Sequence, residues 1–163
     1  MLLLNNCKED ILEDDKLTLN KTPFAGQELK IDGYYYTTFG NIMIIYFFYH
    51  DGTILSGGHI AEDELSEQEQ KYVNGNFFVS KKDNKLYWGI YNIDGNQIKI
   101  EKWYPSSGGG MPVYLHEGII LNDTTFSITT SIRPKTGEEK QLNEVYHFKP
   151  FSPKPDSTNK FIK

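Results

Sequence analysis

Residues 86–104, LYWGIYNIDGNQIKIEKWY, decide the fold of this chain. In the second half of the stretch Ile98 and Ile100 alternate with polar residues, which is the period-two pattern of a half-buried strand. Between the two halves, Asp94-Gly95 is typical of a tight hairpin turn that needs a positive φ. The stretch therefore predicts two antiparallel strands joined by a short turn.

Short apolar runs and turn signals continue on both sides of this hairpin. Residues 42–49 form the most apolar run, and Asp51-Gly52 shortly after it is a second hairpin signal. Residues 61–72 differ, because their Glu and Gln side chains favour one short, mostly solvated helix. The expected strands are 34–39, 42–50, 53–56, 77–80, 86–93, 97–104, 113–121, 125–132 and 143–148.

These elements predict an all-β fold, an antiparallel meander of eight to nine strands with one short helix. A meander of this size removes its exposed edges by closing into a barrel, whose interior is either filled by side chains or holds one small ligand. Residues 30–151 are the expected barrel. We expect an acidic, extended tether at 8–29 and a C-terminal tail at 152–163, where prolines end strand pairing.

Composition and charge exclude several classes of protein. The chain has 163 residues, the size of one domain. A net charge of −5 argues against a nucleic-acid partner, which needs a basic surface. The single cysteine rules out a disulfide within the chain and a cysteine-based zinc site, and no apolar run approaches the roughly 20 residues of a membrane helix.

The first residues are MLLLNNCKED, a short Leu run that ends at Cys7 and is followed by charge. This resembles the end of a bacterial lipoprotein signal peptide, with residues 1–7 as the residual signal and Cys7 as the lipidated residue. Lys8 and the acids after it resemble the export signal of surface lipoproteins in some Gram-negative bacteria. Asn6 departs from the small residue usual before the Cys, and the alternative is a free thiol in a disordered tail. The resemblance implies a membrane partner, through a lipid anchor, at the outer membrane or cell surface.

The barrel region has a resemblance of its own. Gly33-Tyr34 opening the first strand, and the hairpin of residues 88–100, are similar to the corresponding parts of small lipocalin-like bacterial lipoproteins. The similarity covers roughly residues 30 to 150. One departure is the helix at 61–72, which interrupts the strands instead of following them. The resemblance implies a lipocalin-like barrel with a binding or structural role, and it passes on no active-site residues.

The residue types that perform catalysis or bind metals are present without a supporting pattern. The four histidines, His50, His59, His116 and His147, have no metal-ligand spacing. The Gly-rich loop at 108–110 does not open a helix, as a phosphate-binding loop would. No serine sits in a nucleophile motif, and the clustered carboxylates lie on the helix and in a turn. We therefore expect no enzyme activity, no metal and no cofactor.

Apolar and aromatic side chains on the strands are the remaining candidates for function. Such residues line ligand pockets, although more often they are simply core. One hypothesis is a barrel that binds a small apolar or sugar-like ligand at the cell surface, and the alternative is a protein–protein interaction module with a filled barrel. A third, weaker alternative is a lipocalin-like enzyme, which would need convergent polar side chains inside the barrel. The candidate ligand-binding residues are Trp88, Ile90, Ile98, Ile100, Phe126 and Tyr146.

Overall fold

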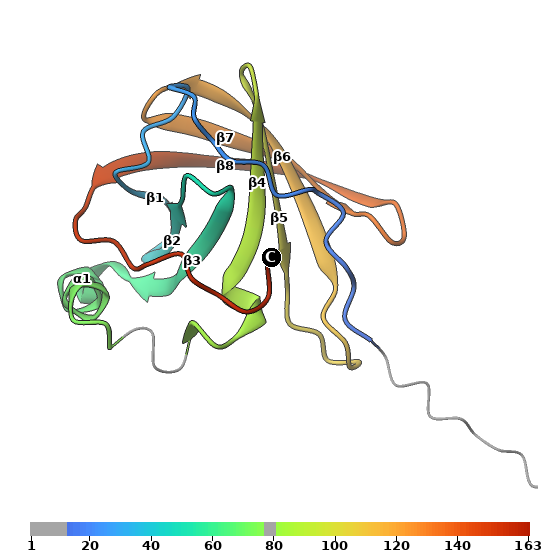
Figure 1. Ribbon diagram of the computed structural model, residues 1–163, viewed down its shortest axis with the longest axis horizontal. Coiled ribbons are helices and arrows are strands. Elements are labelled where there is room, and N and C mark those ends of the chain that lie inside the picture. Colours follow the sequence, from blue (N-terminus) through green and yellow to red (C-terminus); the bar gives the residue numbers. More distant parts are fainter. Residues whose placement is uncertain (1–12, 77–80) are drawn as a thin grey trace, which may run out of the picture.

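The computed structural model describes residues 13–76 and 81–163 and forms a closed barrel of eight antiparallel strands. Each strand pairs with the next along the chain, and β8 pairs with β1 to complete the wall (Figure 1). The predicted meander barrel is confirmed, and the strand expected at 77–80 lies outside the described residues. The strands are β1 (Gly33–Phe39), β2 (Ile42–Phe48), β3 (Thr53–Ala61), β4 (Trp88–Asp94), β5 (Gln97–Trp103), β6 (Val113–Asn122), β7 (Thr125–Arg133) and β8 (Glu138–Pro150).

The hairpins follow the turn signals, and two strands are longer than expected. Gly95 has a φ of +58° between β4 and β5, as the turn requires. β3 does not end at Gly57 but runs on to Ala61, through a bulge at which the pairing with β2 shifts between Ile45 and Tyr46. β8 begins at Glu138, five residues before the expected start at Asn143.

Side chains on the two faces of the sheet form two separate hydrophobic clusters. Residues that pair directly across antiparallel strands share a face. Tyr91 pairs with Ile100, and both belong to the inner cluster, whereas Ile90 pairs with Glu101 on the outer face. The buried inner cluster comprises Leu29, Ile31, Tyr35, Tyr46, Phe48, Ile54, Tyr91, Ile98, Ile100, Phe126, Ile128 and Tyr146. The buried outer cluster comprises Tyr34, Met43, Ile45, Phe47, Tyr49, Leu55, Ile60, Tyr72, Trp88, Ile90, Trp103, Val113 and Ile162.

One end of the barrel is covered by the segment that leads into β1. We call this the upper end; it carries the β4–β5 turn and the β6–β7 turn at Asp123. Lys30 donates its backbone N–H to the Asp123 carbonyl at 2.8 Å, and Leu29 and Ile31 are buried in the inner cluster. The opposite, lower end carries the β1–β2 turn and the loop that joins β5 to β6 (Figure 1).

The acidic segment before the barrel has no regular secondary structure, but residues 13–24 do not stand off the domain as the expected tether would. Thr18 and Leu19 donate their backbone N–H groups to the carboxylate of Glu101, each at 2.7 Å. The segment also neutralises its own acids: Asp14 pairs with Lys85 at 2.7 Å, and Asp15 pairs with basic residues of the β7–β8 turn. Paired carboxylates do not repel one another, so the segment lies along the outer wall. We call residues 13–24 the N-terminal strap.

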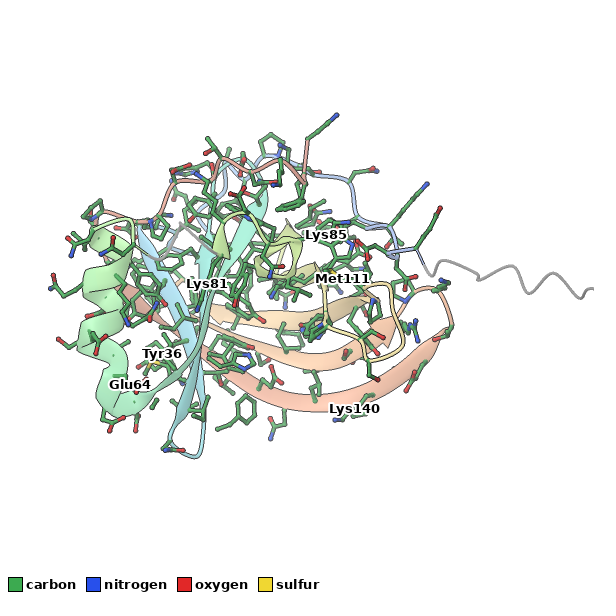
Figure 2. The ribbon with its side chains drawn as sticks, turned by 90° about the horizontal axis from the view of Figure 1, so that it is seen from below. Tyr36, Glu64, Lys81, Lys85, Met111 and Lys140 are labelled. Carbon is green, nitrogen blue, oxygen red and sulfur yellow. The ribbon has the colours of Figure 1, made fainter. Side chains whose placement is uncertain are left out.

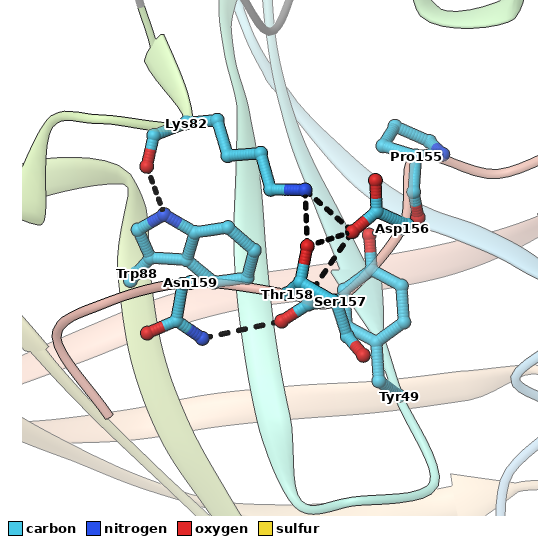
Figure 3. A network of polar contacts seen from close by, with 8 residues as sticks. All are labelled: Tyr49, Lys82, Trp88, Pro155, Asp156, Ser157, Thr158 and Asn159. Atoms are coloured by element: carbon cyan, nitrogen blue, oxygen red, sulfur yellow. Dashed lines mark hydrogen bonds and ion pairs between the residues drawn. The ribbon is translucent and has the colours of Figure 1, made fainter. Parts of the chain in front are cut away.

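The C-terminal tail also packs against the barrel instead of fading into solvent. Tyr49 donates its hydroxyl to the Pro155 carbonyl at 2.7 Å, and Ile162 is buried in the outer cluster. Lys82 binds both Asp156 and Thr158, each at 2.5 Å (Figure 3). The strap and the tail thus cover apolar residues on the outer face of the barrel that would otherwise face water.

The helical segment lies between β3 and β4. A short 3-10 turn (Glu62–Glu64) leads into α1 (Leu65–Val73), which is followed by its C-cap Asn74 and by Gly75 with a positive φ, close to the predicted end at residue 72. Tyr72 is its buried anchor, because its hydroxyl donates to the Gly57 carbonyl at 2.7 Å. Within 13–76 and 81–163, no helix has the length and apolar character needed to cross a membrane.

Candidate functional site

The structure separates the six residues predicted to bind a ligand. Ile98, Ile100, Phe126 and Tyr146 all belong to the inner cluster, as expected. Trp88 and Ile90 do not, because the β4–β5 register turns the odd-numbered residues of β4 inward and the even-numbered ones outward. The expectation that these two residues line the interior is therefore wrong. The indole N–H of Trp88 instead donates to the Lys82 carbonyl at 2.8 Å, beneath the C-terminal tail (Figure 3).

Aromatic rings pack closely in the upper half of the interior. Phe48 lies 4.8 Å from Tyr91 and 5.4 Å from Tyr35, between ring centroids, with edge-to-face geometry. Tyr35 lies 5.1 Å from Phe126, which stacks on Tyr146 at 4.8 Å. Such spacings are those of mutually packed rings. This half of the barrel is a filled core.

The lower half of the interior is different, because β5 brings a lysine into it. Lys102 lies on the same face of the strand as Ile98 and Ile100, and only 5% of its surface is exposed. Its ammonium lies 5.1 Å from the ring centroid of Tyr46 and 5.4 Å from that of Tyr104. Within the described ranges it forms no ion pair with a carboxylate. Cation–π contacts with these two rings therefore offset only part of the hydration that the ammonium has lost.

Further polar side chains surround this lysine. His116 pairs with Ile100 across β5 and β6, and its Nε2 lies 3.4 Å from the Tyr104 hydroxyl. On β8, Tyr146 donates its hydroxyl to Glu144 at 2.9 Å. Tyr46 stacks on Tyr146 with 5.6 Å between centroids and so links the aromatic core to Lys102. We call the set of Tyr46, Lys102, Tyr104, His116, Glu144 and Tyr146 the inner polar cluster.

Two more basic residues lie near the lower end. His59 pairs with Ile44 of the inner face and is exposed to solvent. Lys140 pairs with Ser131, which in turn pairs with His116, so its side chain is on the inner face of β8. Figure 2 views the molecule from below, and Lys140 lies there on the wall formed by β6 to β8. The lysines on this part of the inner face are thus the buried Lys102 and the solvent-exposed Lys140.

Burial changes the acid–base chemistry of the cluster. It lowers the pKa of Lys102 to about 8, since the ammonium has lost most of its contact with water. Burial, assisted by the charge of Lys102, lowers the pKa of His116 to about 4. Burial also raises the pKa of Tyr46 to about 12 and that of Tyr104 well above its ordinary value. Near neutral pH the cluster thus contains an ammonium, a neutral imidazole and protonated phenols.

Other features of the described residues give weaker candidates. No three His, Cys, Asp or Glu side chains in these ranges are placed to hold a metal ion. A pocket of about 590 Å³ lies at the upper end of the barrel beside Phe24 and Leu29, and another of about 460 Å³ lies between the strap and the tail. Neither is lined by the inner polar cluster. Cys7 lies outside the described residues.

The comparisons with known proteins provide no further guide to the site. No protein-family model, no curated protein and no solved structure matches the chain. The geometry of the barrel is therefore the basis for the function proposed below.

One signal for this site was present in the sequence. The alternation that turns Ile98 and Ile100 inward also turns Lys102 inward, two residues further along the same strand. Tyr104 follows Lys102 at the same spacing, just after the end of β5. The remaining four members of the cluster come from β2, β6 and β8, and only the register of the closed barrel brings them together.

Proposed function

We propose that this chain is a lipocalin-like binding protein that holds a small organic ligand at the inner polar cluster. The supporting observation is the convergence of Lys102, His116 and the Tyr46 and Tyr104 hydroxyls from three strands and a loop. Polar groups inside a barrel are costly unless they are fully paired, and apolar side chains would fill the same space more favourably. Groups with this arrangement suit a ligand that completes their interactions.

The proposal modifies the hypothesis of a purely apolar ligand. The filled upper half leaves the apolar interior occupied by side chains of the chain itself. A ligand at the lower half would meet aromatic rings on one side and polar groups on the other. Such a combination of apolar walls and few polar contacts is typical of small-molecule sites.

Binding is a better proposal than catalysis for this cluster. Convergent polar side chains are what the enzyme alternative requires, and the inner polar cluster contains them. Its best acid–base pair is Tyr104 with His116, at 3.4 Å, a long contact for proton transfer. The raised pKa of Tyr104 keeps its phenol protonated, which also disfavours a role as base.

As a lipid-anchored protein, the chain would present this barrel at the outer membrane or cell surface. The resemblance of residues 1–10 to a lipoprotein signal supports this part of the proposal. The alternative function, a protein–protein interaction module, is favoured by the filled upper core and by Ile119 and Leu121. These two side chains on β6 are 43% and 58% exposed.

A fluorescent probe tests the proposal. Folded protein should bind N-phenyl-1-naphthylamine, a neutral apolar dye, saturably and at one site. Tyr104→Ala should weaken the binding about tenfold, since stacked and apolar contacts of this kind contribute about 1 kcal/mol or more. Trp88→Phe is the matched control on the outer face and should leave binding unchanged.

Two outcomes would contradict the proposal. Absence of saturable binding in protein with a native near-ultraviolet spectrum would favour the interaction module. Binding that survives Tyr104→Ala but is lost in the double variant Ile119→Ser, Leu121→Ser would place the ligand on the outer face.

A further inference from the structure

The charge of Lys102 indicates the chemical class of the ligand. The ammonium is buried on the inner face of β5, and the described residues offer it two aromatic faces and no carboxylate. Glu144, the carboxylate in the cluster, accepts a hydrogen bond from Tyr146 and forms no ion pair with Lys102. A buried ammonium without a counterion is unfavourable, because its lost hydration is not replaced.

The groups around Lys102 can serve as donors toward the same region. Tyr46 and Tyr104 carry hydroxyls whose protons are retained to high pH, and Lys140, which is exposed to solvent, adds a second cation on the inner face of β8. A cationic group with neighbouring hydroxyl donors is suited to an oxyanion. The same groups would leave a neutral ligand beside an unpaired charge.

The aromatic rings beside Lys102 indicate the chemical nature of the rest of the ligand. Tyr46 stacks on Tyr146, and Tyr146 stacks on Phe126, so one aromatic column runs from Lys102 into the core. An apolar or aromatic body would lie against this column while its charged group faces Lys102. A small hydrated ion would gain little from the rings.

We infer that the barrel binds organic anions, molecules with one carboxylate, sulfonate or phosphate group on an apolar body, and that Lys102 is the counterion of that group. This inference depends on the proposed binding function. It adds the charge of the ligand and names the residue that selects it.

A matched pair of dyes tests the inference on the full chain. 8-Anilinonaphthalene-1-sulfonate differs from N-phenyl-1-naphthylamine by one sulfonate. The wild type should bind the sulfonate dye about tenfold more tightly or better, because a charge-assisted hydrogen bond contributes on that scale. Lys102→Met should remove this preference while it leaves the neutral dye bound with similar affinity. Lys102→Arg, which keeps the charge, should restore part of the preference.

Competing acids identify the body of the ligand. Octanoate and 1-naphthoate should both displace the sulfonate dye from the wild type, and their order shows whether an aliphatic or an aromatic body fits better. Equal binding of the two dyes to the wild type would overturn the inference and leave the binding function in place. A preference for the sulfonate that persists in Lys102→Met would overturn the role of Lys102. Failure of both dyes to bind would overturn the proposed function itself.

Discussion

Near neutral pH, the buried ammonium of Lys102 opposes folding of the barrel. In the unfolded chain this group has a pKa of 10.5, and in the folded barrel burial lowers the pKa to about 8. Between these values the unfolded chain binds more protons than the folded one, so stability increases as the pH rises. Below about pH 8 the full cost is present, about 3 kcal/mol at about 1.4 kcal/mol per unit of pKa.

This cost predicts the behaviour of Lys102→Met. Met fills a similar volume without charge. At about pH 7 the free energy of unfolding of the variant should therefore exceed that of the wild type by up to about 3 kcal/mol. The advantage should shrink as the pH rises from about 8 to about 10, where the wild type gains stability. Urea denaturation at a series of pH values measures both quantities. A variant that is less stable than the wild type would contradict the assignment.

The titration of other groups near Lys102 does not obscure its effect on stability between about pH 8 and about pH 10. The pKa values of His116 and His59 are lowered, so both rings are neutral above about pH 7. Those of Tyr46 and Tyr104 are raised, so the phenols keep their protons through it. Lys154, near the upper end, also has a pKa lowered to about 8 by burial. It affects both proteins equally, so the difference between their curves isolates Lys102.

At the scale of elements, β5 holds different partners on its two faces. Lys102 faces inward, and the adjacent Glu101 faces outward, where it is fully buried beneath the N-terminal strap. Its carboxylate accepts the backbone N–H groups of Thr18 and Leu19 and, at 2.6 Å, the Thr18 hydroxyl. Glu101 is therefore one of the residues that hold the strap against the wall.

Glu101→Gln tests this role of the strap. The amide has one acceptor oxygen, and its NH₂ would meet a backbone N–H group, so the variant should lose about 2 kcal/mol of stability. Hydrogen exchange at Thr18 and Leu19 should increase, while dye binding on the opposite face stays unchanged. Thr18→Val, which removes only the hydroxyl, is the control and should cost about 1 kcal/mol. Equal exchange in wild type and Glu101→Gln would show that other contacts hold the strap.

At the scale of the whole molecule, both terminal segments pack on the outer face, through the strap and through Tyr49, Trp88 and Ile162. The inner polar cluster lies on the other face of the same sheet. A lipid anchor attached before residue 13 would therefore not need to pass through the ligand site. This arrangement is compatible with a barrel held at a membrane surface.

The anchor gives a prediction of its own. When the native gene is expressed in a Gram-negative host, the wild type should partition into the detergent phase on phase separation, and Cys7→Ala should stay in the aqueous phase. Several acyl chains on one Cys provide stable membrane attachment, which explains the expected difference. Labelling with radioactive palmitate should follow the same pattern. If both proteins remained aqueous, the lipoprotein assignment would fail.

The sequence by itself determined the local elements. Period-two alternation and the Asp-Gly turns depend on neighbouring residues, so the hairpins and the meander could be predicted from them. The predicted β3 was too short, and the cause lies in the tertiary structure. A β-carbon at Gly57 would lie 2.5 Å from the Tyr72 hydroxyl and 2.7 Å from Ile45, so this Gly continues the strand where the helix packs closely.

Only the tertiary structure decided which face of each strand is inside. Alternation shows that two faces exist, but in this barrel apolar side chains cover both, because the strap, α1 and the tail bury the outer face of β1 to β5. Alternation placed Trp88 and Tyr91 on opposite faces of β4 without showing which face is inside, and the register decided it by pairing Tyr91 with Ile100. The sequence also did not show which basic residues pair with the acids of the strap. Those partners are 71 to 120 residues away in the sequence, and barrel closure brings them together.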